Sequence, residues 1–118
     1  MSVFVDTGAW FAYFVRRDSD HNSARNWVST NESPLVTSDY ILDELFTLLK
    51  IRESHVVAVA AGKVLIDERI CQIIGITSED FARAWALFCP IQRQRLVFYR
   101  LYEQSNDGAF KYLHSIFL

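Results

Sequence analysis

The sequence is poor in the residues that mark several classes of protein. It has two cysteines, two prolines, four glycines and one methionine in 118 residues. Because Cys71 and Cys89 are few and far apart, they exclude a disulfide framework and a cysteine metal knuckle. We expect both to be small, buried hydrophobic side chains. The chain also lacks internal repeats and low-complexity tracts.

Two further absences concern membranes and export. No apolar run in the chain approaches the ~20 residues that span a membrane. No positively charged segment precedes the first apolar run, so no signal peptide is predicted. We therefore expect no membrane association and a reducing, cytoplasmic environment.

Excess charge of either sign is missing as well. The net charge is −2, which excludes a global basic surface for strong non-specific binding of nucleic acid. The charges are nevertheless uneven, because residues 1–50 carry four Lys/Arg against seven Asp/Glu. This acidic half either holds a cation or is solvated surface. With 51% hydrophobic and 14% aromatic residues, the chain is predicted to fold as one packed domain, residues 1–118.

The first motif stands at the start of the chain. Residues 3–8 read VFVDTG, in which three apolar residues run into a carboxylate, a hydroxyl and a glycine. This pattern predicts a buried strand that delivers Asp6 to the edge of a sheet, where ligands bind in open α/β folds. The alternative is that Asp6 only caps the helix that follows.

Strands and helices are predicted to alternate along the chain, which indicates an α/β fold with a parallel sheet. Ser38 is the expected N-cap of the central helix, and Arg16 and Arg17 are expected to complement the dipole at the end of the first helix. The predicted strands are residues 3–5, 35–37 and a segment within 67–76; the predicted helices are residues 9–17, 21–29, 39–52, 53–65 and a last one beginning at 77.

Glu44 is the second candidate for chemistry. Within the helix predicted for residues 39–52, apolar residues at helical spacing form a core stripe, and Tyr40, Glu44 and Thr47 share the neighbouring face. A carboxylate at the edge of a buried stripe needs a cation or hydrogen bonds to offset its desolvation. The alternative is an ordinary surface glutamate. Asp39, in the first turn, is explained by capping and the helix dipole.

Two blocks of sequence together resemble a known family. Residues 3–17 read VFVDTGAWFAYFVRR and residues 36–52 read VTSDYILDELFTLLKIR. They resemble the first and second motifs of the PIN domain, and most closely those of its VapC-like toxin group. The resemblance covers residues 1–89 and implies a three-layer α/β/α fold with a central parallel sheet. It also implies a Mg²⁺- or Mn²⁺-dependent endoribonuclease that cuts single-stranded RNA, binds a cognate antitoxin protein and forms a homodimer.

The resemblance assigns roles to three residues. Asp6 matches the first metal-binding aspartate of the family, Glu44 matches the acidic residue of its third helix, and Thr7 stands where a hydroxyl supports the site. Mg²⁺ and Mn²⁺ prefer hard oxygen ligands, which carboxylates supply. A cation held in this way can generate hydroxide and stabilise charge on the attacked phosphate.

The sequence departs from the family after Cys89. The third block of the family resembles DxxFTDCTS and a later FD follows, whereas residues 90–104 read PIQRQRLVFYRLYEQ. Residues 90–118 therefore form a divergent aromatic and basic tail, predicted to contain a helix to Glu103 and a loop at 105–108. We expect the C-terminal part of the sheet to be incomplete or replaced.

A shifted reading frame accounts for this divergence. Synonymous codons exist for residues 94–103 that, with the flanking bases, encode DKDWSFTDCTS when read one base out of frame. This is the missing third block. We hypothesise that residues 90–118 come from a frameshift that truncates the domain, either in the gene itself or through a sequence error.

Three hypotheses about function follow. With only Asp6 and Glu44 in place, the first is a ribonuclease that is impaired or inactive. The second is a non-catalytic PIN-like module that retains partner binding or self-association. The third treats the tail as a nucleic-acid platform of cations and stacking rings, against the alternative of a packed amphipathic face; its residues are Arg93, Arg95, Phe98, Tyr99, Arg100 and Tyr102.

The coding DNA tests the frameshift hypothesis. We expect the frame displaced by one base across residues 94–103 to encode a run similar to FTDCTS. If that frame encodes no such run, the hypothesis is wrong and the tail is an original part of the chain.

Overall fold

The computed structural model describes residues 2–89 and 110–112 of the chain. Within them four strands form one parallel sheet in the order β3-β2-β1-β4. The strands are β1 (Ser2–Phe4), β2 (Leu35–Ser38), β3 (Gln72–Ile74) and β4 (Phe110–Tyr112). The helices are α1 (Thr7–Phe14), α2 (His21–Thr30), α3 (Asp39–Arg52), α4 (His55–Ile66) and α5 (Ser78–Phe88).

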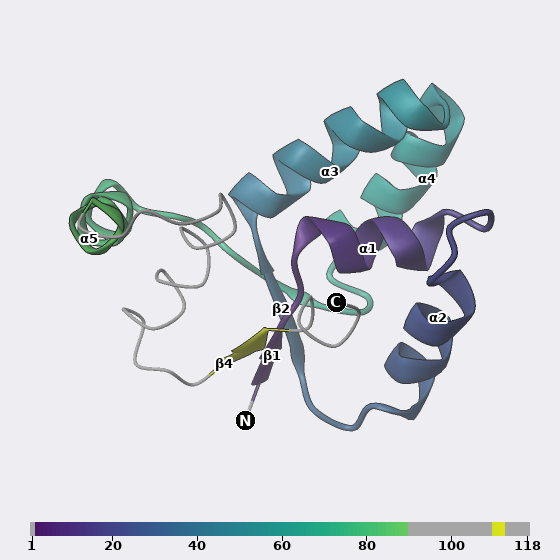
Figure 1. The fold of residues 1–118 in the computed structure, drawn as a ribbon, viewed down its shortest axis with the longest axis horizontal. Helices are drawn as coiled ribbons and strands as arrows, with labels where there is room; N and C mark the ends of the chain where they lie inside the picture. Colours follow the sequence, from purple (N-terminus) through teal and green to yellow (C-terminus); the bar gives the residue numbers. More distant parts are fainter. Residues whose placement is uncertain (1, 90–109, 113–118) are drawn as a thin grey trace.

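The helices lie on both sides of the sheet. Figure 1 shows α1, α2 and α4 to the right of the strands and α5 to the left, as an α/β/α arrangement requires. Helix α1 packs against α2 and α3, and α3 packs against α4. The core between these helices and the sheet includes Phe4, Trp10, Leu45, Leu49 and Leu65, all fully buried. The predicted α/β fold with a parallel sheet is therefore confirmed.

The edge of the sheet beyond β1 is formed by residues of the divergent tail. Strand β4 pairs with β1 in parallel, with Val3 opposite Lys111. The sequence pattern did not indicate this strand, because three residues are too few for a period to be read. The helix predicted up to Glu103 and the loop predicted at 105–108 lie outside the described residues.

Four of the five helices, α1, α3, α4 and α5, begin at a side chain that accepts a hydrogen bond from the first turn. Ser38 accepts from the Ile41 amide at 3.2 Å, as predicted for α3, and Ser54 accepts from the Val57 amide at 3.2 Å to begin α4. A capping box of Thr77 and Asp80 begins α5.

The capping box sets the ionisation of Asp80. The hydrogen bond from the Thr77 backbone amide lowers the pKa of the Asp80 carboxyl. Because the pKa is lower in the folded chain, the contribution to stability is present above the unfolded pKa of about 3.9. It is lost as the pH falls through the folded value, so neutral solution keeps the box intact.

The end of α1 differs from the prediction. The helix ends at Phe14 and not at Arg17, because Val15 turns to extended backbone with φ −101° and ψ 107°. Arg17 lies beyond the end of α1 and does not act as the predicted cation in its last turn. Its guanidinium instead pairs with Glu53 at 3.0 Å and donates to the Arg52 carbonyl at 3.0 Å, at the C-terminus of α3. The partners of Arg17 are thus Glu53 and the Arg52 carbonyl, and not the last carbonyls of α1 as predicted.

The start of α4 also differs. The predicted helix included Glu53, but α4 begins at His55, because Ser54 caps it in extended backbone. No helix among residues 2–89 is both long and apolar enough to cross a membrane.

A buried hydroxyl joins β1, β2 and α1. Thr37 is fully buried, donates to the Val5 carbonyl at 3.0 Å and accepts from the Trp10 indole N–H at 3.2 Å. These bonds hold the end of β1 and the first turn of α1 against β2. The position of Asp6, which lies between Val5 and α1, therefore depends on Thr37.

We expect Thr37→Val to destabilise the chain by about 1–3 kcal/mol, because both buried partners lose their hydrogen bond while the side-chain volume is retained. The free energy of unfolding in urea measures this. Thr47→Val, at an exposed position of α3, is the matched control and should cost less than about 0.5 kcal/mol. Equal values for the two variants would contradict the role of Thr37.

Candidate functional site

Asp6 lies at the carboxyl end of β1, at the N-cap of α1. It is 2% exposed, and its Oδ1 accepts a hydrogen bond from the Ala9 amide at 3.1 Å. Asp6 thus caps α1. Capping does not exclude metal binding, because a carboxylate has about four acceptor positions. The cap also fixes the orientation of the side chain.

Three hydroxyls surround this point of the fold. Thr7 follows Asp6 directly, and Thr37 and Ser38 lie at the end of the neighbouring strand β2. All three are buried, and the Thr7 hydroxyl has no hydrogen-bond partner within the described part of the chain. Thr37 and Ser38 are satisfied by bonds within the fold, whereas a buried hydroxyl without a partner is costly, so Thr7 makes this edge of the sheet a candidate site.

The sequence pattern missed this cluster of hydroxyls, although a signal was present. Residues 5–7 read VDT and residues 36–38 read VTS, so two strands end in an apolar residue followed by two polar ones. The carboxyl ends of paired parallel strands meet at one edge of the sheet, so the two segments could have been predicted to lie side by side.

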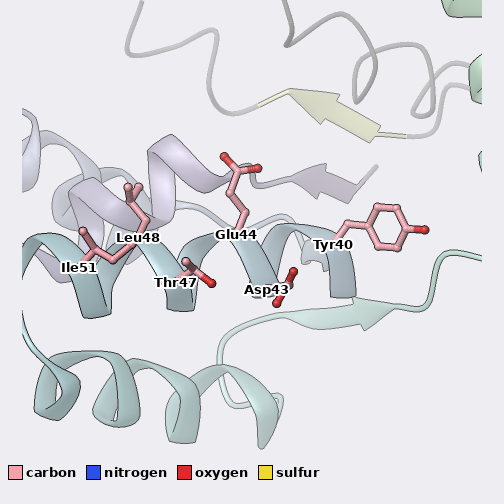
Figure 2. Close-up of a pocket in the computed structure, with 6 residues that line it drawn as sticks. All are labelled: Tyr40, Asp43, Glu44, Thr47, Leu48 and Ile51. Atoms are coloured by element: carbon pink, nitrogen blue, oxygen red, sulfur yellow. The ribbon is translucent and has the colours of Figure 1, made fainter.

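Glu44 lies on the exposed face of α3 and lines a groove of about 570 Å³. Figure 2 shows its side chain directed away from the helix, on the side where the β1–α1 connection runs. The predicted face of Tyr40, Glu44 and Thr47 is confirmed, and the groove also includes Asp43, Leu48 and Ile51. As a surface glutamate in a groove, Glu44 is accessible to a ligand from solution.

Asp6 caps α1 and Glu44 lies on α3, and these two helices pack against each other. Among residues 2–89 and 110–112, no group of three or more His, Cys, Asp or Glu side chains is close enough to hold a metal ion. Asp39 has a structural role, because its Oδ1 accepts hydrogen bonds from the backbone amides of Tyr40 at 2.9 Å and Ile76 at 3.1 Å.

The donors at this site are hard oxygens. Mg²⁺ is commonly bound by one or two carboxylates and keeps several waters. The buried carboxylate of Asp6, the neighbouring Thr7 hydroxyl and the accessible carboxylate of Glu44 therefore fit Mg²⁺ or Mn²⁺ in kind, although they are a small set.

Comparison with known proteins identifies the family. The family model that describes the PIN domain matches residues 3–92 of the sequence. The chain belongs to the PIN domain family. The family expected from residues 3–17 and 36–52 is thus confirmed, and the match ends close to Cys89, where the resemblance was predicted to end.

Curated relatives and a solved structure agree with this PIN assignment. The chain is 30% identical over 83 residues to the 23S rRNA-specific endonuclease VapC20 of Mycobacterium tuberculosis strains CDC 1551 / Oshkosh and H37Rv. The match covers 70% of this chain and 63% of the relative, so the chain spans less than two thirds of that protein.

The fold of a PIN relative is also similar. The crystal structure of M. tuberculosis VapC20, a sarcin-ricin loop cleaving toxin, superposes with a TM-score of 0.76 at 22% identity. The superposition covers 89% of this chain and 83% of that one.

The two cysteines of the PIN domain differ in environment. Burial raises the pKa of the Cys71 thiol to about 11, and the negative charge of Glu68 adds to the shift. Cys89 is exposed, so the prediction that both are buried is wrong for it. The reason is its place at the end of α5, a helix in which only Ala84 is buried.

We expect the thiol reagent 5,5′-dithiobis(2-nitrobenzoate) at pH 8 to modify Cys89 rapidly and Cys71 only after unfolding. With a pKa of about 11, roughly one Cys71 thiol in a thousand is ionised at this pH, and the thiolate is the nucleophile. Absorbance at saturation in native and denatured protein, with Cys89→Ser as control, counts the two groups. Two fast-reacting thiols in the native protein would contradict the burial of Cys71.

Proposed function

We propose that this chain is a single PIN-like domain of the VapC-type endoribonuclease class, in which Asp6 and Glu44 are the metal-binding and catalytic residues and Thr7 supports them. The observation that carries the proposal is the buried Asp6 carboxylate at the end of β1, beside α3 with Glu44 in its groove. The proposed cofactor is Mg²⁺ or Mn²⁺ and the substrate is single-stranded RNA. A cytoplasmic antitoxin protein and a second copy of the chain are the proposed partners.

The two carboxylates have different tasks in this proposal. Asp6 is held by its cap to Ala9, so one oxygen is already oriented before any ligand arrives. Glu44 projects from an exposed helix face and reaches a ligand in the groove. When bound, the cation supplies charge neutralisation at the phosphate and a more acidic water.

The proposed activity is weak or absent. Two carboxylates hold a cation less tightly than the three or four of the family's motifs, and each missing charge removes electrostatic stabilisation of the transition state. The alternative function is a catalytically inactive PIN-like module that keeps partner binding or self-association. The apolar surface of α5, with Phe81, Trp85 and Leu87 exposed, favours such a role.

Metal binding and RNA cleavage test the proposal together. We expect Mn²⁺ to bind the parent chain weakly, with a dissociation constant of about a millimolar or higher, since few ligands are charged. Asp6→Asn and Glu44→Gln should each weaken binding at least fivefold in isothermal titration. Asn caps helices as well as Asp does, so Asp6→Asn should preserve the fold. Glu32→Gln, at an exposed carboxylate away from the groove, is the matched control.

The outcomes separate the site from the activity. Mn²⁺ affinity that is unchanged in Asp6→Asn and Glu44→Gln would contradict the site. Efficient cleavage of a single-stranded RNA that needs Mg²⁺ or Mn²⁺ and disappears in Asp6→Asn would contradict the predicted inactivity while supporting the site. Binding of an antitoxin peptide that is equal in all variants, without cleavage, would favour the inactive module.

A further inference from the structure

The groove on α3 has an acidic end, and arginines lie beyond its other end. Near the start of the helix it is lined by Asp43 and Glu44 beside the ring of Tyr40, and it continues over Leu48 to Ile51. Figure 2 shows these side chains following one another along the helix. From Tyr40 to Ile51 the helix rises by about 16 Å. The groove is thus an elongated track with an acidic end.

Arginines gather at the other end. Arg52 follows Ile51 at the end of α3, and the Arg17 guanidinium bonds the Arg52 carbonyl at 3.0 Å. Arg16 and Arg17 line a second hollow of about 350 Å³, together with Glu53. Glu53 pairs with Arg17 and neutralises its charge. Arg16 and Arg52 then leave this region with a net charge of +2. Arg16 and Arg52 are both exposed.

Tyr40 offers a flat surface at the acidic end. Tyr40 is 40% exposed, and its ring makes an edge contact with Phe81, with the ring centroids 6.2 Å apart. An exposed, supported aromatic ring is the usual platform on which an unpaired base stacks.

We propose that a single RNA strand lies along α3, with one base stacked on Tyr40 beside Glu44 and a more distant phosphate held by Arg16 and Arg52. This inference rests on the proposed function, because it places the bond to be cut at the acidic end. The track is long enough for at most about five nucleotides at the stacked spacing of 3.4 Å. Tyr40 and the arginines are binding residues in this proposal, and they set how much RNA is needed for full affinity.

The charge pattern favours RNA over a peptide. A phosphate backbone needs cations along its path, and it tolerates carboxylates only where a divalent cation bridges them, which the proposed function places at Glu44. An apolar peptide would not use the arginines that lie beyond the groove. An acidic peptide would use them, but would gain nothing from the exposed ring of Tyr40.

Fluorescence anisotropy tests the inference without reading cleavage. The protein is the full chain carrying Asp6→Asn, and the probe is a fluorescein-labelled, 12-nucleotide RNA without self-complementarity, titrated at several salt concentrations in Mg²⁺. We expect Tyr40→Ala to weaken binding at least fivefold with an unchanged salt slope, and Tyr40→Phe to bind as the parent does. The Arg16→Ser/Arg52→Ser variant should bind more weakly, with a slope of log K against log salt smaller by about 1.4.

Two controls make the assignment specific. Arg69→Ser removes an exposed arginine outside both hollows and should leave affinity and slope unchanged. A trinucleotide competitor is too short to reach both ends, so its affinity should depend on Tyr40 and not on Arg16 and Arg52. Thermal unfolding verifies that each variant is folded.

Several results would overturn the inference. They are an absence of RNA binding by the parent, equal affinities for Tyr40→Ala and Tyr40→Phe, and an arginine variant that behaves like Arg69→Ser. In the last two cases the groove would be free for a protein partner. All of these measurements read RNA binding and not cleavage, so they test the inference even if the chain is catalytically inactive.

Discussion

The hydrogen bonds of Thr37 are the constraint on which the site depends. They tie the Val5 carbonyl and the Trp10 indole to β2, and Asp6 directly follows the first of these two anchors. The Asp6 cap to Ala9 then fixes the first turn of α1 from the same point. A strand end, a helix start and the neighbouring strand are therefore locked together around one buried carboxylate. In such a junction the side chain cannot relax toward solvent, so its charge must be compensated inside the fold.

This arrangement explains why the polar groups occur where they do. Thr7, Thr37 and Ser38 are buried at the edge of a sheet whose strands are otherwise apolar. Ser38 and Thr37 are satisfied by local bonds that also shape α3 and β1. The Thr7 hydroxyl has no such structural task among the described residues, and it stands next to Asp6. One polar edge thus contains both groups that maintain the fold and the oxygens of the proposed site.

Much of the fold could be read from the sequence, for physical reasons that the structure makes plain. Residues 3–5 and 35–37 are continuous apolar runs ending in polar side chains, and Ser38 has the hydroxyl that a helix start requires, so strands and cap were predictable. The end of α1 was not, because its location depends on the bonds of Arg17 to Glu53 and to the Arg52 carbonyl. The exposure of Cys89 was missed for a similar reason, since it depends on how little of α5 packs against the rest.

The site was predictable as two residues but not as a groove. Asp6 and Glu44 came from the resemblance of two motifs, whereas the hollow that Arg16 and Arg17 line at the end of α3 depends on how α1 and α3 pack. With two carboxylates proposed for the site, the cation would draw its remaining ligands from water and from the phosphates of the RNA itself.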